Sequence, residues 1–143
     1  MTTIKPSKSF WIVSVIAVIW NLMGIFAFMS QAFMSSAMLA ELPAEQAELI
    51  RSTPQWLTGI FAIATVTGLI GSLLLMLRKK SATTLFFISV IGVLIQMVYS
   101  FFATEALQVY GVVQGLVMPL MVIIIAVYLY FFSKKSAEKG YLN

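Results

Sequence analysis

Four stretches of the chain are apolar almost without interruption, at residues 10–33, 56–77, 81–104 and 106–132. None of them has a charged side chain in its interior. Because a helix rises about 1.5 Å per residue and the hydrocarbon core of a bilayer is about 30 Å thick, roughly 20 apolar residues are enough to cross it. The strands of a membrane barrel instead alternate between apolar and polar residues. The pattern therefore predicts an all-α fold with four membrane-spanning helices.

The connections between these stretches predict how the helices pack. Only Arg78-Lys79-Lys80 separates the second stretch from the third, and the link at Glu105 is equally short, so neighbouring helices must run antiparallel. The result is an up-down four-helix bundle, formed as one membrane domain by residues 1–143. Residues 133–143 are polar and rich in lysine, and we expect them to form a frayed cytoplasmic tail.

The longest connection, residues 34–55, contains a segment with the composition of a helix. Residues 43–51 begin with a proline, carry an acidic residue early and end with Arg51, an order that suits the helix dipole. This helix should end before Pro54, because proline disfavours helix in the residue that precedes it. We predict a short interfacial helix in an outer loop. The alternative is a lid over a cavity that faces outward.

Basic residues gather on one side of the predicted bundle. All Lys and Arg residues except Arg51 precede the first helix, lie between the second and third, or follow the fourth; they are Lys5, Lys8, Arg78, Lys79, Lys80, Lys134, Lys135 and Lys139. The positive-inside rule therefore places both termini in the cytoplasm. A second reading of the same bases is contact with anionic lipid head groups. Nothing in their pattern supports nucleic-acid binding.

The composition agrees with a membrane protein and excludes several kinds of chemistry. Only 10% of the residues are charged, against about a quarter in soluble proteins. The chain has neither Cys nor His, which removes disulfides, zinc sites built on those residues and catalytic devices that use them. No ionisable acid or base lies within a predicted span, so a buried proton relay has no carrier. We expect no enzyme activity, no metal and no cofactor.

Each predicted helix carries small or polar residues along one face, and these faces should meet inside the bundle. An amide in hydrocarbon must find a hydrogen-bond partner, because an unpartnered polar group is costly there. One interpretation of the amides is hydrogen bonding between helices. The other is a neutral, hydrogen-bonding cavity that suits a polyol or sugar. The candidate side chains for this cavity are Trp20, Asn21, Gln31, Gln96, Tyr99 and Gln114.

Glycines at helical spacing predict close contact between helices, because small residues let membrane helices approach one another. The candidates for this packing role are Gly68, Gly92, Gly111 and Gly115. Pro119 follows them in the fourth stretch and leaves the carbonyl near Gly115 without its N–H donor. We therefore expect a kink in the fourth helix.

Several short segments carry a resemblance to a known family: Trp20-Asn21-Leu22-Met23-Gly24, Pro54-Gln55-Trp56, residues 73–77 with the following Arg78-Lys79-Lys80, and Gln96-Met97-Val98-Tyr99-Ser100. With them, the chain resembles over nearly its whole length a family of small bacterial four-helix inner-membrane proteins, some of whose members are labelled sugar transporters. The resemblance implies a bacterial plasma membrane and the four-helix architecture, and it brings no catalytic or transport motif. In size and plan the chain is also similar to the DoxX-like membrane proteins.

Two functions of different classes follow. The first is a small facilitator or binding protein for a neutral polar solute such as a sugar, because the amides lie on faces without charge. The alternative is a non-catalytic accessory or assembly subunit of a larger membrane complex, because Gly111 and Gly115 suggest a docking face. The expected partners are membrane lipid and either a second copy of the chain or another membrane protein, since four helices with short loops enclose little volume.

Overall fold

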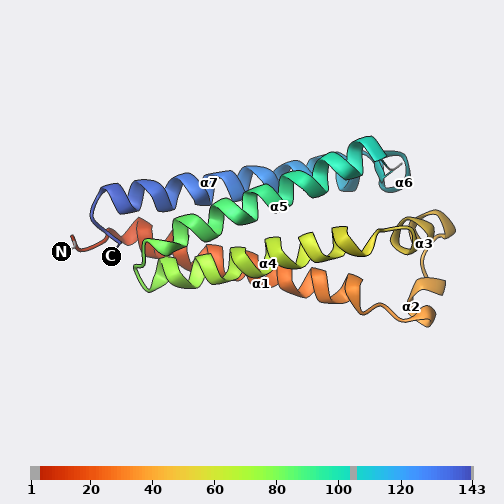
Figure 1. Cartoon of the computed structure of the whole chain (residues 1–143), viewed down its shortest axis with the longest axis horizontal. Helices are drawn as coiled ribbons and strands as arrows, with labels where there is room; N and C mark the ends of the chain where they lie inside the picture. Colours follow the sequence, from red (N-terminus) through yellow and green to blue (C-terminus); the bar gives the residue numbers. More distant parts are fainter. Residues whose placement is uncertain (1–3, 104–105, 143) are drawn as a thin grey trace.

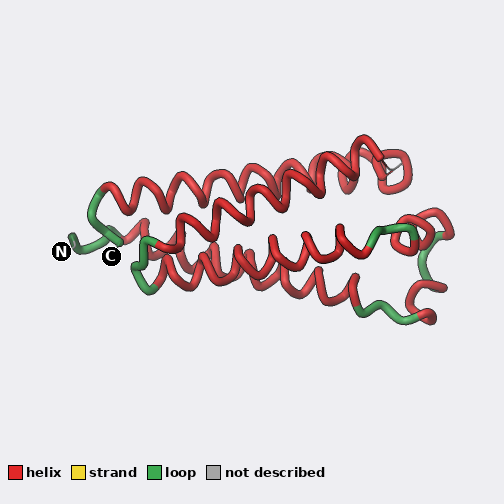
Figure 2. The backbone as a smooth tube through the Cα atoms, in the orientation of Figure 1, coloured by secondary structure: helices red, strands yellow, loops and turns green. Residues whose placement is uncertain are grey.

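The computed structural model describes residues 4–103 and 106–142, with only the backbone at Ala106, Leu107, Gln114 and Gly115. All regular structure in this part of the chain is helical (Figure 2). Four of its helices are long and apolar enough to cross a membrane; they are α1 (Lys8–Ala32), α4 (Gln55–Met76), α5 (Ser81–Ala103) and α7 (Met118–Glu138). The all-α prediction is confirmed, and the chain has the character of an integral membrane protein.

Three short helices lie together at one end of the long ones: α2 (Ser36–Ala40), α3 (Ala44–Arg51) and α6 (Ala106–Val112) (Figure 1). We call this the loop end. Both termini and the turn between α4 and α5 lie at the opposite end, which we call the basic end because the lysines of the termini and the turn gather there.

The long helices are arranged as two pairs. α1 packs against α4, α4 against α5, and α5 against α7, whereas α1 and α7 make few close backbone contacts. In Figure 1 the α1–α4 pair and the α5–α7 pair approach each other at the basic end and diverge toward the loop end. Side chains, such as those of Phe10 and Phe132, therefore make most of the contact between α1 and α7.

Local sequence signals explain where several helices begin and end. The Ser7 hydroxyl accepts a hydrogen bond from the Phe10 N–H at 3.4 Å, as an N-cap residue does. Ser35 caps α2 in the same way, at 3.2 Å from the Met38 nitrogen. The helix predicted at residues 43–51 is α3, which ends at Arg51 with Ser52 as its C-cap. The short helix α2 was not predicted.

The fourth apolar stretch is not one helix, which corrects the prediction of a continuous helix at residues 106–132. The backbone leaves helical geometry at Gly111, with φ 85° and ψ 177°, and a π-helix at Val113–Val117 leads into α7. Pro119 has no N–H to donate to the preceding turn, and a wider π turn is one way for a helix to absorb that loss. The distortion thus lies where Pro119 predicts a kink. The predicted end of the third helix at Thr104, and Glu105, lie outside the described residues.

The basic end is closed by packed side chains, and residues 133–142 of the tail that was predicted to fray at 133–143 are part of this closure. α7 continues to Glu138, and the side chain of Leu142 is only 1% exposed. The Phe10 ring stacks on Phe132 at 6.0 Å between centroids and meets the Tyr141 ring edge-on at 5.6 Å. The buried core at this end comprises Phe10, Ala17, Leu75, Ala82, Phe86, Leu129 and Leu142.

Hydrogen bonds also hold the two termini to the α4–α5 turn. The Arg78 side chain donates from Nε to the Tyr141 carbonyl at 2.9 Å and from Nη2 to the Ile4 carbonyl at 2.8 Å. The Ile4 N–H in turn donates to the Gly140 carbonyl at 2.8 Å. One arginine therefore connects three segments that are far apart in the sequence.

The glycines predicted to mediate packing have different roles. A Cβ at Gly92 would lie 2.9 Å from the Ala64 Cβ, so glycine permits the close approach of α5 to α4, and a Cβ at Gly68 would collide with the Asn21 side-chain oxygen. At Gly111 a Cβ would meet nothing within 4 Å among the described atoms. Its positive φ, not helix packing, is what requires glycine there. The surroundings of Gly115 lie outside what the structure describes.

Candidate functional site

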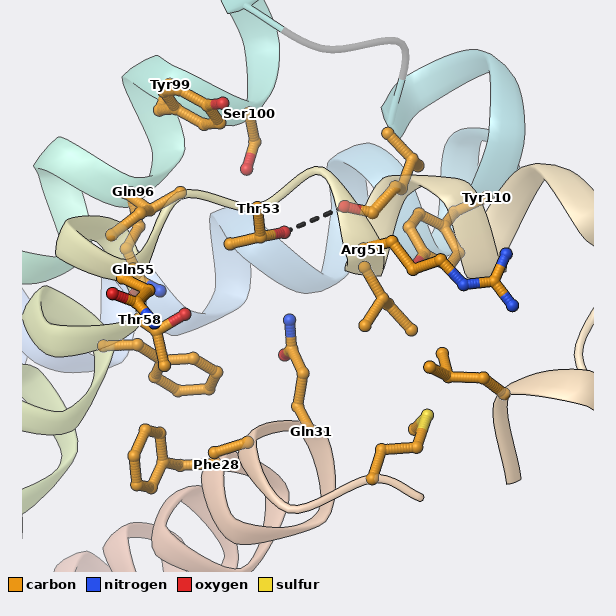
Figure 3. Close-up of a pocket in the computed structure, with 17 residues that line it drawn as sticks. Phe28, Gln31, Arg51, Thr53, Gln55, Thr58, Gln96, Tyr99, Ser100 and Tyr110 are labelled. Carbon is orange, nitrogen blue, oxygen red and sulfur yellow. Dashed lines mark hydrogen bonds between the residues drawn. The ribbon is translucent and has the colours of Figure 1, made fainter. Parts of the chain in front are cut away.

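A cavity of about 540 Å³ opens at the loop end between the ends of the long helices and the short helices that connect them (Figure 3). We call it the loop-end cavity. Its volume is in the range of about 300–1,000 Å³ that is usual for small-molecule sites. It is lined by Phe28, Gln31, Ala32, Met34, Leu39, Leu49, Ile50, Arg51, Thr53, Gln55, Leu57, Thr58, Phe61, Gln96, Tyr99, Ser100 and Tyr110.

Three glutamine amides from different helices face this cavity: Gln31 of α1, Gln55 of α4 and Gln96 of α5. Figure 3 shows Gln31 reaching up from α1 into the space between Thr53 and Thr58. None of the three amides has a hydrogen-bond partner in the described part of the chain. Each therefore has donors and an acceptor free for a ligand or water.

Aromatic rings hold the wall of the loop-end cavity in place. The Tyr99 ring meets Trp56 edge-on at 5.7 Å, and Phe28 of α1 meets Phe61 of α4 in the same way at 5.4 Å. Edge-to-face pairs at this distance are favourable. The second pair joins α1 to α4 one turn before Gln31, whose own side chain is exposed.

The charge of the lining is confined to one margin of the loop-end cavity. Arg51 is the charged residue among the described lining residues, and its side chain is exposed. Figure 3 shows its guanidinium group directed away from Gln31, Gln55 and Thr58. Burial raises the pKa of Tyr110, on α6, above the usual value of 10.0, so its hydroxyl stays neutral at physiological pH. The amides thus face an uncharged space.

A second, mostly apolar cavity of about 290 Å³ lies deeper in the bundle, among all four long helices. We call it the mid-bundle cavity. Its lining includes Trp20, Asn21, Met23, Phe86, Val93, Met118, Val122, Ile125, Ala126 and Leu129. Phe61 and Gln96 line both cavities, so the two spaces adjoin at these side chains.

Asn21 bonds to a neighbouring helix, as the first interpretation of the amides requires. Its amide nitrogen donates to the Ala17 carbonyl and to the Ser72 hydroxyl, each at 2.8 Å. The Ser72 hydroxyl in turn donates to the Gly68 carbonyl at 2.8 Å. One amide proton of Asn21 therefore bonds within α1 and the other joins α1 to α4, so Asn21 cannot donate to a solute without breaking one of these bonds.

The structure divides the candidate residues between the two cavities. Gln31 and Tyr99 line the loop-end cavity, Trp20 and Asn21 line the mid-bundle cavity, and Gln96 lines both. The side chain of Gln114 lies outside the described residues.

Sequence reasoning missed several polar lining residues, namely Gln55, Thr58, Ser100 and Tyr110. Gln55 stands at the first position of α4, where a polar residue is expected to face water, and only the fold shows that it faces a cavity. Leu49 and Ile50 of α3, the predicted interfacial helix, also line the cavity. This placement agrees with the alternative in which the outer segment covers a cavity. The sequence signal that pointed to this segment was the placement of Pro43 and Arg51, which predicted α3.

Comparison of the chain with models of known protein families, with curated proteins and with solved structures found no match. The family resemblance, and the bacterial plasma membrane that it implies, stay predictions.

Proposed function

We propose that the protein is a membrane-embedded binding protein, or a small facilitator, for a neutral polar solute such as a polyol or sugar. The observation that carries this proposal is the convergence of the Gln31, Gln55 and Gln96 amides on one cavity with no hydrogen-bond partner in the described part of the chain. Gln31 and Gln55 are exposed in the bundle and Gln96 is half-buried, so all three amides are open to water or to a ligand in the cavity.

The chemistry of the lining supports a neutral ligand. An amide both donates and accepts hydrogen bonds, as does a hydroxyl group, so several amides match a molecule with several hydroxyls. A charged ligand would need a counter-charge, since an unpaired charge is expensive away from water. The Arg51 guanidinium is directed away from the amides (Figure 3).

The closed basic end favours binding as the primary step. A solute in the loop-end cavity has the packed core around Phe10, Leu75 and Leu129 between it and the opposite end of the bundle. Facilitated passage would require the two helix pairs to separate there. In the accessory-subunit alternative, Gly111 and Gly115 do not share one continuous helical face, because the backbone leaves helical geometry at Gly111.

The test is equilibrium binding of labelled methyl glucoside to the protein in phosphatidylcholine nanodiscs. We expect saturable binding, and a loss of affinity of about tenfold in Gln31→Leu and in Gln96→Leu, as one lost hydrogen bond and one unpaired ligand group can cause. Gln108→Leu is the matched control, because Gln108 is exposed on α6 and does not line the cavity. The absence of wild-type binding, or unchanged affinity in both cavity variants, would contradict the proposal.

A further inference from the structure

The two adjoining cavities differ sharply in chemistry. The loop-end cavity presents amides and hydroxyls, whereas the mid-bundle cavity is walled mainly by aliphatic, Met and aromatic side chains. Gln96 stands where they meet, with its backbone on α5 and no hydrogen-bond partner in the described part of the chain. A purely polar solute would occupy the first space and leave the second unfilled.

Away from Gln96, water is a poor occupant of the mid-bundle cavity. A buried water needs two to four polar partners, and an apolar wall does not offer them. The Asn21 protons are already used by Ala17 and Ser72, and the Ser89 hydroxyl donates to the Ala64 carbonyl at 2.8 Å. An apolar cavity left empty also forfeits dispersion contacts along its whole lining. An aliphatic chain needs no polar partner, and it would restore the dispersion contacts along the lining.

The α1–α7 side of the bundle is the side through which such a chain would enter. α1 and α7 supply opposite walls of the mid-bundle cavity, through Trp20 and Met23 on one side and Met118 and Val122 on the other. These two helices make few close backbone contacts, so side chains alone separate the cavity from the surroundings of the bundle there. In a membrane those surroundings are lipid tails.

We infer that the ligand is a single-chain amphiphile with a neutral, hydroxyl-rich head group. The head group binds the amides of the loop-end cavity, and the aliphatic chain passes Gln96 and fills the mid-bundle cavity. This inference rests on the proposed function, because the head group uses the same amides. It adds the second half of the ligand and the side from which the ligand enters.

The experiment compares a labelled glucoside that has a medium-length alkyl chain with methyl glucoside, both on the protein in phosphatidylcholine nanodiscs. The alkyl glucoside also partitions into lipid, so its affinity is expressed relative to its concentration in the bilayer, which is measured with empty nanodiscs. Val122→Trp fills the mid-bundle cavity from α7. Ile124→Trp is the matched control, because Ile124 lies on the same helix with 65% of its side chain exposed.

We expect Val122→Trp to weaken binding of the alkyl glucoside about tenfold and to change binding of methyl glucoside by less than about twofold, because only the chain loses its space. Ile124→Trp should change neither. Retained binding of methyl glucoside also shows that the variant is folded. If Val122→Trp loses it, Ala126→Leu fills the same cavity with a smaller change and replaces it in the comparison.

The outcomes separate this inference from the proposed function. Binding of methyl glucoside together with alkyl-glucoside binding that Val122→Trp leaves unchanged would overturn the inference and leave the proposed function standing. Absence of binding by both glucosides would overturn both. Alkyl-glucoside binding that depends on Val122 but not on Gln31 or Gln96 would reveal a plain lipid site and overturn the inference, while the binding of methyl glucoside decides the proposed function separately.

Discussion

The two ends of the bundle are built from the same four helices and have opposite properties. At the basic end, Phe10 packs between Phe132 and Tyr141, and Arg78 ties both termini to the α4–α5 turn. At the loop end the helix pairs diverge, and three amides face a cavity of about 540 Å³ with no hydrogen-bond partner in the described part of the chain.

This difference shows how a small bundle can hold a cavity and still be stable. The core around Leu75 and Phe86 and the tie through Arg78 fix the helices at one end. The other end can then remain open without the pairs coming apart. The closed end provides the stability, and the open end provides the space for a ligand.

The largest expected effect comes from breaking the closed end at Gly71. A Cβ at Gly71 would lie 3.2 Å from the ring of Phe86, which is 2% exposed, so Gly71→Leu must displace a buried aromatic side chain. We expect the free energy of unfolding to fall by about 3 kcal/mol, as overpacked cores do. Unfolding by sodium dodecyl sulfate in mixed micelles measures it.

Gly59→Leu is the control on the same helix at the loop end. Gly59 is exposed, and a Cβ there meets nothing within 4 Å. The free energy of unfolding should change by less than about 1 kcal/mol. Equal losses in the two variants would mean that the ends do not differ in packing.

Removing the Arg78 side chain should loosen the closed end with a smaller effect. Arg78→Ala deletes the hydrogen bonds to the Tyr141 and Ile4 carbonyls and keeps a Cβ at the positive φ of 61°. We expect a loss of about 2 kcal/mol, because these are hydrogen bonds from a charged donor at a partly exposed position. Hydrogen exchange should accelerate at the Ile4 N–H, which bonds to Gly140.

Lys79→Ala is the control for this variant, since Lys79 is exposed in the same turn. Its exchange rates at Ile4 should match those of the wild type. If both variants exchange alike, the termini are held by the hydrophobic core alone.

Ser72→Ala tests the contact between α1 and α4 at the middle of the bundle. It removes the hydroxyl that accepts from Asn21 and donates to the Gly68 carbonyl. Thermal unfolding in detergent should show a loss of about 1 kcal/mol, the usual size of such bonds between membrane helices. Ser30→Ala, at an exposed position where the hydroxyl bonds only back to Phe26, should have no effect, and an equal loss there would refute the role of Asn21.

The smallest expected effect is a pH dependence of the stability of α6 at the loop end. Burial raises the pKa of Tyr110 above 10.0, so the folded state disfavours its ionised form. The resulting stability is fully present below a pH of about 10, the ordinary tyrosine value, and is lost as the pH rises through the higher folded pKa. Protection factors in α6, which correct exchange rates for the base-catalysed intrinsic rate, should fall over that interval in the wild type and not in Tyr110→Phe. The same fall in protection factor in the variant would exclude Tyr110 as its origin.

The sequence predicts most of the fold because the membrane imposes the pattern. Continuous apolar runs marked α1, α4 and α5 to within a few residues, and proline marked α3. The break at Gly111 was missed, because an apolar run looks the same whether or not its backbone turns. The packed tail was missed as well, since a lysine-rich segment gives no sign that Leu142 reaches a core contributed by residues far away in the sequence.

The candidate site was less accessible to sequence reasoning. A polar residue inside a span is equally consistent with a bond between helices, as Asn21 makes, and with a free amide, as Gln96 presents. Which of the two applies depends on whether a hydrogen-bond partner on a neighbouring helix faces the amide, and the arrangement of the helices decides that. Gln55 and Tyr110 lie at helix ends or in connections, where polar residues are ordinary.

Because the chain has no Cys, cysteine accessibility tests the contrast between the ends most directly. Single cysteines are placed at Thr58, which lines the loop-end cavity, and at Ser133, which is 0% exposed at the basic end, with exposed Ser81 as a control for reagent access. In nanodiscs, a charged methanethiosulfonate reagent should modify Thr58→Cys and Ser81→Cys rapidly and Ser133→Cys slowly. Rapid modification of Ser133→Cys, or a protected Thr58→Cys, would contradict a bundle that is closed at its basic end and open at its loop end.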